Sequence, residues 1–324
     1  MKNFRIIIAF IIGMLLLSLS AYSQENLKKV YIIQTIAHPA LDRTHDGIIA
    51  KLNAEGFIDG KNIELKFANA QGDIVLSNQI AQKFASNDPN IIVAIATSAA
   101  QSAKSATRNN NVPVVFSSVT DPIGAGLVKN LEQPGDNITG VSNFVNLSQQ
   151  LELFKQILPN LSKLGFIYNP GEANSVKILE SLKKEARLQN IEIIASVAGR
   201  TTEILAATNK LIGKVDAIFI SNDNTALAAF GVITKTATVA KIPVFVSDTD
   251  MVVNGALAAL GPNQYNLGTQ TAKMIIAILN GKPVKELPVE FPNMVELVLN
   301  QKIADQLGIQ LPADNASKAK KILR

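Results

Sequence analysis

A proline-led run of strand-forming residues occurs twice in this sequence, and each copy ends in small polar and acidic residues. The first copy is VPVVFSSVTD at residues 112–121, and the second is IPVFVSDTDM at residues 242–251. An apolar run that breaks into Ser, Thr and Asp is typical of a buried strand followed by a polar loop. Two such runs predict two similar lobes whose polar strand ends face each other across a cleft.

Strand-type and helix-type segments alternate before the first run. Strands are expected at residues 30–36, 63–67, 91–96 and 112–116, and helices at 38–55, 74–85 and from 97 onward. The run at 91–96 is apolar throughout, which indicates a parallel strand covered on both faces. The alternation predicts an open, doubly wound α/β sheet with parallel strands.

The same order of segments begins again at Gly140. Strands are expected at residues 164–168, 191–195, 217–220 and 242–246, and helices at 147–158 and 173–189. Two strands and a helix are left over, at 256–260, 295–299 and 263–279, so the chain must cross between the lobes more than once. Candidate crossings lie at 140–143, 261–262 and 288–292. We place the N-terminal lobe at residues 24–141 plus 263–288, and the C-terminal lobe at residues 142–262 plus 289–324.

The first segment has the features of a secretory signal peptide. Lys2 and Arg5 precede the apolar run Ile6–Leu19, and Ala21-Tyr22-Ser23 supplies small residues, so residues 1–23 are expected to be removed after about Ser23. The apolar run is shorter than the about 20 residues that a membrane-spanning helix needs, and a retained anchor is the alternative. The chain holds no cysteine, which argues against a lipoprotein and excludes disulfides. We therefore expect a free protein of the bacterial periplasm.

Polar residues gather at the predicted carboxyl ends of the strands, where open parallel α/β sheets bind their ligands. Free N–H groups at a helix start, here Thr97 and Ser98, suit a carboxylate, whereas Asp223 and Asp248 suit an ammonium group. A zwitterion would then hold both lobes, although each residue taken alone can also be a helix cap or a turn residue. The candidate ligand-binding residues are Gln34, His38, Thr97, Ser98, Ser118, Thr120, Asn143, Asn169, Glu172, Asn174, Ser175, Asp223, Asn224 and Asp248.

Signatures of other functions are missing from the sequence. There is no G-x-S-x-G motif, the only two histidines are both early, and Lys129 stands where a dinucleotide fingerprint needs its third glycine. The basic residues are scattered apart from the tail at 318–324, which we interpret as a solvated terminus, so no nucleic acid is expected. We expect neither an enzyme nor a metal or other cofactor. The rival hypothesis is an exported enzyme that uses Asp223 or Asp248 as a base.

Several motifs resemble the exported substrate-binding proteins of ABC importers, in the branch whose members bind tryptophan and other aromatic amino acids. They cover nearly all of the chain after residue 23, and they include HPALDRTHDGI, IVAIATSAAQ, PVVFSSVTDPIGAGLV, LGFIYNPGEANS and IPVFVSDTDM. The resemblance implies a type I periplasmic-binding-protein fold, with two α/β lobes joined by three crossings. It also implies closure on a small-molecule ligand and docking to the membrane permease of an ABC transporter.

The resemblance also assigns roles to the candidate residues. It implies that Thr97 and Ser98 meet a carboxylate, with Thr120 close by, and that Asp223 and Asp248 face an amino group. The wall of the second lobe would consist of Asn143, Asn169, Glu172, Asn174 and Ser175.

The ligand itself is the least constrained part of this interpretation. The chain has no tryptophan, and Phe116, Phe144, Phe219 and Phe245 are the possible aromatic walls, although each suits the core better. This shortage argues mildly against a sugar, which often stacks on aromatic rings. We expect a monomeric periplasmic binding protein for an amino acid, with an aromatic amino acid as a candidate. The alternatives are a sugar, a nucleoside or a short peptide.

Overall fold

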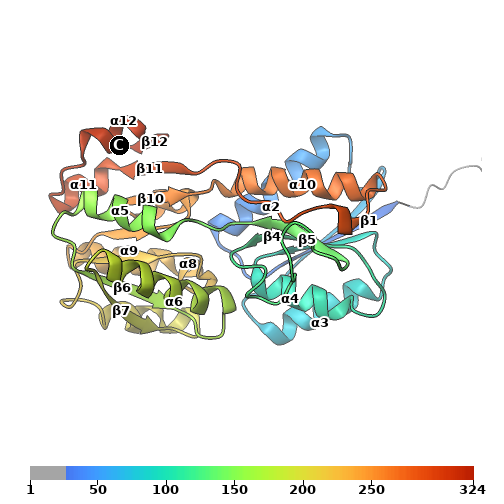
Figure 1. The fold of residues 1–324 in the computed structure, drawn as a ribbon, viewed down its shortest axis with the longest axis horizontal. Helices are drawn as coiled ribbons and strands as arrows, with labels where there is room; N and C mark the ends of the chain where they lie inside the picture. The colour runs from blue at the N-terminus through green and yellow to red at the C-terminus, as the bar shows by residue number, and fades with distance from the viewer. Residues whose placement is uncertain (1–26) are drawn as a thin grey trace, which may run out of the picture.

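The computed structural model describes residues 27–324 and consists of two α/β lobes that lie side by side (Figure 1). The expected signal peptide and its cleavage site lie outside the described residues. Within those residues, every helix is too short or too polar to cross a membrane. The predicted architecture of two doubly wound α/β lobes is confirmed, since each lobe has its own sheet with helices on both faces.

The N-terminal lobe contains a five-stranded parallel sheet in the order β2-β1-β3-β4-β5. Its strands are β1 (Lys28–Gln34), β2 (Ile63–Asn69), β3 (Ile91–Ile95), β4 (Val114–Val119) and β5 (Ile138–Ser142). Its helices are α2 (Pro39–Ala54), α3 (Ile74–Ala85), α4 (Thr97–Ala106) and α10 (Gln264–Leu279). Successive residues of a strand point to opposite faces, so Ile32 packs in the cluster with α2 and α10, whereas Ile33 packs in the cluster with α3 and α4.

Helix α10 comes late in the sequence but packs on α2 of the N-terminal lobe. Two glycines allow this close approach. A Cβ atom at Gly47 would lie 2.1 Å from the carbonyl oxygen of Tyr265, and one at Gly268 would lie 2.1 Å from that of Thr44. The contact fixes the start of α10, and therefore Gln264, at the junction of the two lobes.

The C-terminal lobe contains a seven-stranded sheet in the order β12-β11-β10-β9-β8-β6-β7, in which only the β10–β11 pair is antiparallel among the described strands. Its strands are β6 (Lys163–Tyr168), β7 (Glu192–Val197), β8 (Ala217–Ile220), β9 (Val244–Val246), β10 (Ala258–Gly261), β11 (Glu296–Asn300) and β12 (Lys321–Leu323). Its helices are α5 (Leu147–Ile157), α6 (Ala173–Leu188), α7 (Ile204–Asn209), α8 (Asn224–Ala228), α9 (Phe230–Val239), α11 (Gln301–Leu307) and α12 (Ala313–Lys318).

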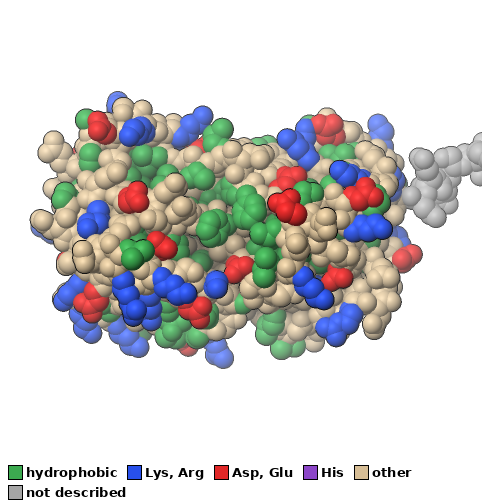
Figure 2. Space-filling view, viewed as in Figure 1, with side chains coloured by type: hydrophobic (Ala, Val, Ile, Leu, Met, Phe, Trp, Pro, Cys, Tyr) green, Lys and Arg blue, Asp and Glu red, His purple; other side chains and the backbone are tan. Residues whose placement is uncertain are grey.

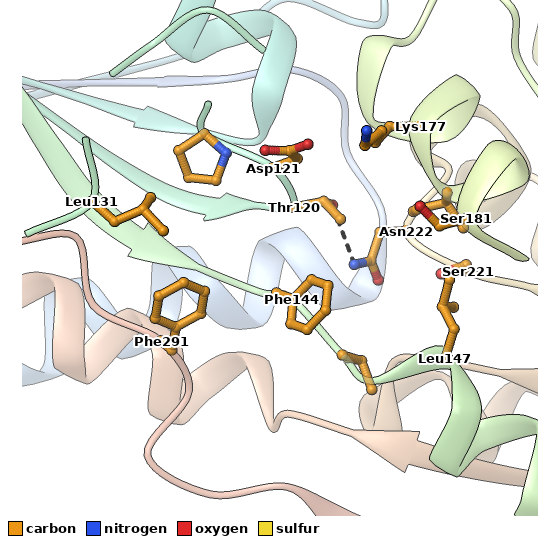
Figure 3. Close-up of a pocket in the computed structure, with 13 residues that line it drawn as sticks. Thr120, Asp121, Leu131, Phe144, Leu147, Lys177, Ser181, Ser221, Asn222 and Phe291 are labelled. Atoms are coloured by element: carbon orange, nitrogen blue, oxygen red, sulfur yellow. Dashed lines mark hydrogen bonds between the residues drawn. The ribbon is translucent and has the colours of Figure 1, made fainter. Parts of the chain in front are cut away.

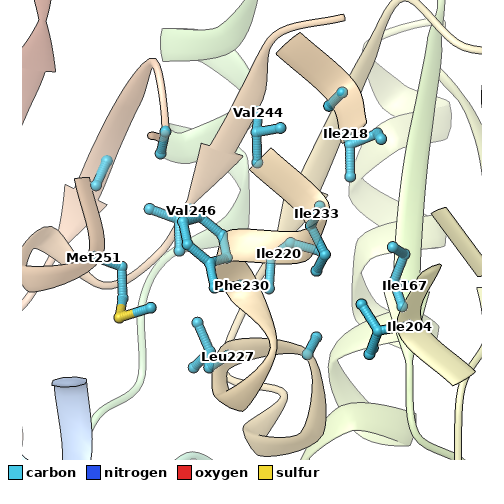
Figure 4. Close-up of a cluster of buried hydrophobic side chains, with 14 of the residues drawn as sticks. Ile167, Ile204, Ile218, Ile220, Leu227, Phe230, Ile233, Val244, Val246 and Met251 are labelled. Atoms are coloured by element: carbon cyan, nitrogen blue, oxygen red, sulfur yellow. The ribbon is translucent and has the colours of Figure 1, made fainter. Parts of the chain in front are cut away.

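Both faces of this sheet are covered by apolar layers. Figure 4 shows the layer in which Phe230 and Ile233 of α9 pack against Val244 and Val246 of β9. The opposite layer contains stacked phenylalanines, with the rings of Phe154 and Phe245 4.1 Å apart. Two fully covered faces explain why the strands read as continuous apolar runs.

The chain passes between the lobes at three places, residues 143–146, 262–263 and 291–295. The first and third crossings leave the N-terminal lobe side by side, because Val141 forms a parallel bridge with Glu290. Their backbones are joined by hydrogen bonds from Ser142 N to Glu290 O at 2.8 Å and from Glu290 N to Gly140 O at 2.9 Å.

Some elements differ from those expected from the sequence. Strand β4 does not end at Phe116 but continues to Val119, with a shift of register between Ser117 and Val119. Ser118 has a left-handed φ of 57° at this irregularity. Strands β5 and β12 and helix α7 were not expected, because each is short and none has a long apolar period.

Candidate functional site

The two lobes meet through side-chain hydrogen bonds between the loops that follow their strands. His38 Nε2 lies 3.3 Å from Asn224 Oδ1, and Asn222 Nδ2 donates to Thr120 Oγ1 at 3.3 Å. His38 Nδ1 accepts from Leu41 N at the start of α2, so the ring proton is on Nε2 and is donated to Asn224. Burial lowers the pKa of His38 to about 4, and the ring is therefore neutral at neutral pH.

Gln264 joins the polar ends of the two repeated runs. Its Oε1 accepts from Ser118 Oγ at 2.8 Å and from Thr44 Oγ1 at 3.0 Å, and its Nε2 donates to Asp248 Oδ1. Ser118 and Asp248 therefore lie on either side of one amide. Burial raises the pKa of Asp248 to about 7. Gln264 was not among the residues predicted from the sequence, although its place just after the candidate crossing at 261–262 was a signal for it.

These residues enclose a small polar space, the inner cavity, of about 10 Å³. A cavity of this size holds about one water molecule. Asn174 lines it, and the buried Oδ1 of Asn174 accepts no hydrogen bond from residues 27–324. The cavity is lined by His38, Leu41, Thr97, Ser118, Asn143, Asn174, Asn222, Asn224, Leu227, Asp248 and Gln264.

The start of helix α8 carries a separate cluster of buried acids. Asp223 caps the helix through Oδ1, which accepts from Ala226 N at 2.7 Å, and its Oδ2 accepts from Asn169 N at 2.6 Å and from Ser175 Oγ. Burial and the charge of Glu172 raise the pKa of Asp223 to about 7. The carboxylate of Asp223 is thus surrounded by donors from its own lobe.

Glu172 completes this cluster. Its two oxygens accept from the backbone N–H groups of Asn224 and Thr225, both at 3.0 Å, and from the side chains of the same two residues. Both acids therefore hold the loops of the C-terminal lobe together.

The structure brings half of the sequence-predicted site residues together around the inner cavity. Those that line it are His38, Thr97, Ser118, Asn143, Asn174, Asn224 and Asp248. Those that line neither this cavity nor the larger pocket described next are Gln34, Ser98, Asn169, Glu172, Ser175 and Asp223. The inner-cavity residues that sequence reasoning missed are Leu41, Asn222, Leu227 and Gln264.

A larger space, the outer pocket, lies beside the inner cavity and has a volume of about 360 Å³ (Figure 3). Thr120 lines the outer pocket, and Asn222 lines both spaces. Its lining residues are Thr120, Asp121, Pro122, Leu131, Phe144, Val145, Leu147, Lys177, Ile178, Ser181, Ser221, Asn222 and Phe291.

The four phenylalanines considered as aromatic walls have different positions. Phe116, Phe219 and Phe245 are fully buried in the cores of the lobes, whereas Phe144 is 50% exposed and lines the outer pocket. Phe291 also lines this pocket and was not expected from the sequence.

The amino-acid sequence matches a known protein family and is similar to a known protein. The family model described as ABC transporter substrate binding protein matches residues 29–323. A tyrosine-binding protein of Clostridioides difficile (strain R20291) is 37% identical over 289 residues, which cover 89% of this chain and 83% of the relative.

Two solved structures of similar sequence differ in how closely they superpose on this chain. An ABC domain from Streptococcus pneumonia in complex with L-Trp is 34% identical, with a TM-score of 0.88 over 92% of this chain and 100% of the other. A ligand-free, open substrate binding protein from Clostridium difficile is 36% identical, with a TM-score of 0.69 over 92% of this chain and 99% of the other.

Proposed function

Because this chain belongs to the family of ABC transporter substrate-binding proteins, we propose that it captures an aromatic amino acid, L-tyrosine or L-tryptophan, between its two lobes. Two relatives support the choice of ligand, since one is a tyrosine-binding protein and the other contains L-Trp. Members of this family bind small molecules, and we propose that the ligand is released unchanged.

The observation that carries this proposal is the closed arrangement of the lobes. The open and the L-Trp-bound relatives are about equally similar in sequence, yet the TM-score is 0.69 with the first and 0.88 with the second. The bridges at His38–Asn224 and Thr120–Asn222 are both 3.3 Å long, which is at the weak end for hydrogen bonds. A ligand that touches both lobes would add the free energy that favours closure.

The inner cavity offers complementary groups for the two ends of an amino acid. Thr97 stands at the N-terminus of α4, where the helix dipole and free N–H groups favour a carboxylate. Asp248 is the acid that lines the cavity, and an ammonium group beside it would favour its ionised form. Asp223, the other acid expected to bind the ammonium group, is instead occupied by donors of its own lobe. We therefore assign the ammonium group to Asp248.

The transport role forms part of the same proposal. We propose that the signal peptide directs the chain to the periplasm, that it works there as a monomer, and that the permease of an ABC importer recognises the closed form. Uptake of labelled tyrosine by cells with and without the gene would test this role. Equal uptake in both would contradict it.

A ligand screen tests the binding function directly. Thermal melting with each amino acid, several sugars and several nucleosides should show the largest increase in Tm with L-tyrosine or L-tryptophan. At a ligand concentration of 100 times Kd, the stabilisation is expected to be about 2.7 kcal/mol. An increase caused only by a sugar, a nucleoside or a short peptide would overturn the choice of ligand. Recovery of a chemically altered ligand would instead support an enzyme.

A further inference from the structure

The outer pocket lies where both lobes and two of the crossings meet. Thr120 and Leu131 come from the N-terminal lobe, and Lys177 and Asn222 come from the C-terminal lobe. Its volume of about 360 Å³ falls in the range of about 300–1,000 Å³ that is typical of small-molecule pockets. Figure 2 shows hydrophobic side chains gathered at the middle of the molecule, where the lobes meet.

The walls of this pocket are mainly apolar, and they carry two accessible aromatic rings. Phe144 comes from the crossing at 143–146 and Phe291 from the crossing at 291–295, and they are 50% and 43% exposed. Both rings lie along one side of the pocket in Figure 3, with Asp121 and Lys177 on the other side. Two half-exposed rings in one pocket suit an aromatic guest, because aromatic pairs gain about 0.5–1.5 kcal/mol beyond the area that they bury.

A thin polar wall separates the outer pocket from the inner cavity. Asn222 Nδ2 donates to Thr120 Oγ1 and to Asn143 O, both at 3.3 Å, and Thr120 Oγ1 donates to Asn143 Oδ1 at 3.1 Å. These contacts are long for hydrogen bonds, so a ligand that replaces them costs little. Thr120, Asn143 and Asn222 therefore belong to the wall between the polar groups of the inner cavity and the apolar walls of the outer pocket.

We propose that the outer pocket receives the aromatic ring of the bound amino acid, and that Phe144 and Phe291 select aromatic over aliphatic side chains. This inference rests on the proposed function, in which the charged ends of the amino acid contact the polar side chains around the inner cavity. At about 10 Å³, the inner cavity must widen to admit these ends and has no room for the ring as well. The ring passes between Thr120 and Asn222, and Asp121, Lys177 and Ser181 supply polar atoms for a phenol hydroxyl or an indole N–H.

The experiment measures binding of L-tryptophan to the wild type and to Phe144→Ala and Phe291→Ala. The chain has no tryptophan, so all indole fluorescence comes from the ligand. In the wild type we expect the emission to move to shorter wavelength on binding, as an indole does in apolar surroundings. In each variant we expect Kd to rise roughly tenfold and the wavelength change to become smaller.

The matched control is Phe67→Ala, because Phe67 is 49% exposed on β2 and lies outside both spaces. This variant should bind like the wild type. If Phe144→Ala does not fold, Phe144→Leu keeps an apolar side chain while removing the ring, and it should show the same loss of affinity for L-tryptophan.

The outcomes separate this inference from the proposed function. If the wild type binds tightly and both pocket variants have unchanged Kd and emission, the proposal that the outer pocket receives the ring is wrong. The proposed function is then unaffected. A wild type that binds no aromatic amino acid would overturn both. An equal loss of affinity in Phe67→Ala and in the pocket variants would also contradict the role proposed for the outer pocket.

Discussion

The helices that follow the equivalent strands β3 and β8 start in opposite ways. Helix α4 in the N-terminal lobe begins after Ala96, which has a φ of 74° and supplies no side-chain cap, and the N–H of Ala99 donates to Thr35 Oγ1 at 3.1 Å. Helix α8 in the C-terminal lobe begins after Asp223, and its first three N–H groups are all taken by Asp223 and Glu172. The first helix start has one N–H group bound to a neutral hydroxyl, whereas the second is already neutralised by two buried acids.

Because of this difference, the two sides of the cleft differ in the charge that they favour, which the sequence alone does not show. A carboxylate is favoured at Thr97, where it would meet free N–H groups, and is repelled at α8 by the acids already there. The acids at α8 stabilise the loops of the C-terminal lobe, and Asp248, which follows the next strand β9, is the acid that lines the inner cavity. The two lobes thus share a fold but, in the proposed function, divide structural and ligand-binding roles differently.

The largest expected effect tests the structural role of the acids at α8. Asp223→Ala removes the acceptor of Asn169 N, Ser175 Oγ and Ala226 N, and should lower the free energy of unfolding by about 4 kcal/mol. The control is Asp73→Ala at the exposed start of α3, where loss of the cap should cost only about 1 kcal/mol. Urea unfolding measures both. Equal losses in the two variants would show that Asp223 is an ordinary cap.

The contribution of Asp248 to stability is expected to appear as a pH-dependent difference between the wild type and Asp248→Asn. The folded pKa of Asp248, about 7, lies above its ordinary value of 3.8, so between these two pH values the folded chain binds more protons than the unfolded chain. Its contribution is therefore fully present below the lower pKa and is lost as pH rises through about 7. Relative to Asp248→Asn, the wild type should lose on the order of 3 kcal/mol between pH 4 and pH 8.

Other buried groups also change stability in the same pH range. Asp223, with a pKa of about 7, acts in the same direction as Asp248, whereas His38, with a pKa of about 4, favours the folded state as pH rises toward 6.5. Both groups are present in the wild type and in Asp248→Asn, so their contributions cancel in the difference. A difference that stays constant between pH 4 and pH 8 would show that the pKa of Asp248 is not raised.

The next expected effect concerns the affinity for the ligand. Asp248→Ala removes the acid assigned to the ammonium group, and a hydrogen bond to a charged group is worth about 1.5–3 kcal/mol. Kd for L-tyrosine should therefore rise roughly 10- to 100-fold in calorimetric titration. Asp250→Ala is the control, since Asp250 accepts from Gln264 N but lies outside the inner cavity. A larger effect in the control would exchange the roles of the two acids.

The sequence predicted the two lobes because their strands are apolar runs of characteristic length, a property that depends on local residues. It could not distinguish Asp223 from Asp248, since an acid after a strand suits both a helix cap and a ligand. That distinction depends on Asn169 and Ser175, which approach Asp223 only in the folded lobe. Gln264 was missed for the same reason, because α10 must first pack on α2 before the amide can join Ser118 to Asp248.

The smallest expected effect tests the open start of α4. Thr97 lines the inner cavity, and Thr97→Val keeps the shape of its side chain but removes the hydroxyl, so Kd for L-tyrosine should rise roughly 2- to 10-fold, as for one neutral hydrogen bond. Ser98→Ala, one residue along, should leave Kd unchanged because Ser98 lines neither the cavity nor the pocket. The two variants keep the same helix start, so the backbone N–H groups and the dipole are common to both. If Ser98→Ala weakens binding more than Thr97→Val, the carboxylate lies on the other side of the helix axis. The roles proposed for α4 and α8 would then be wrong.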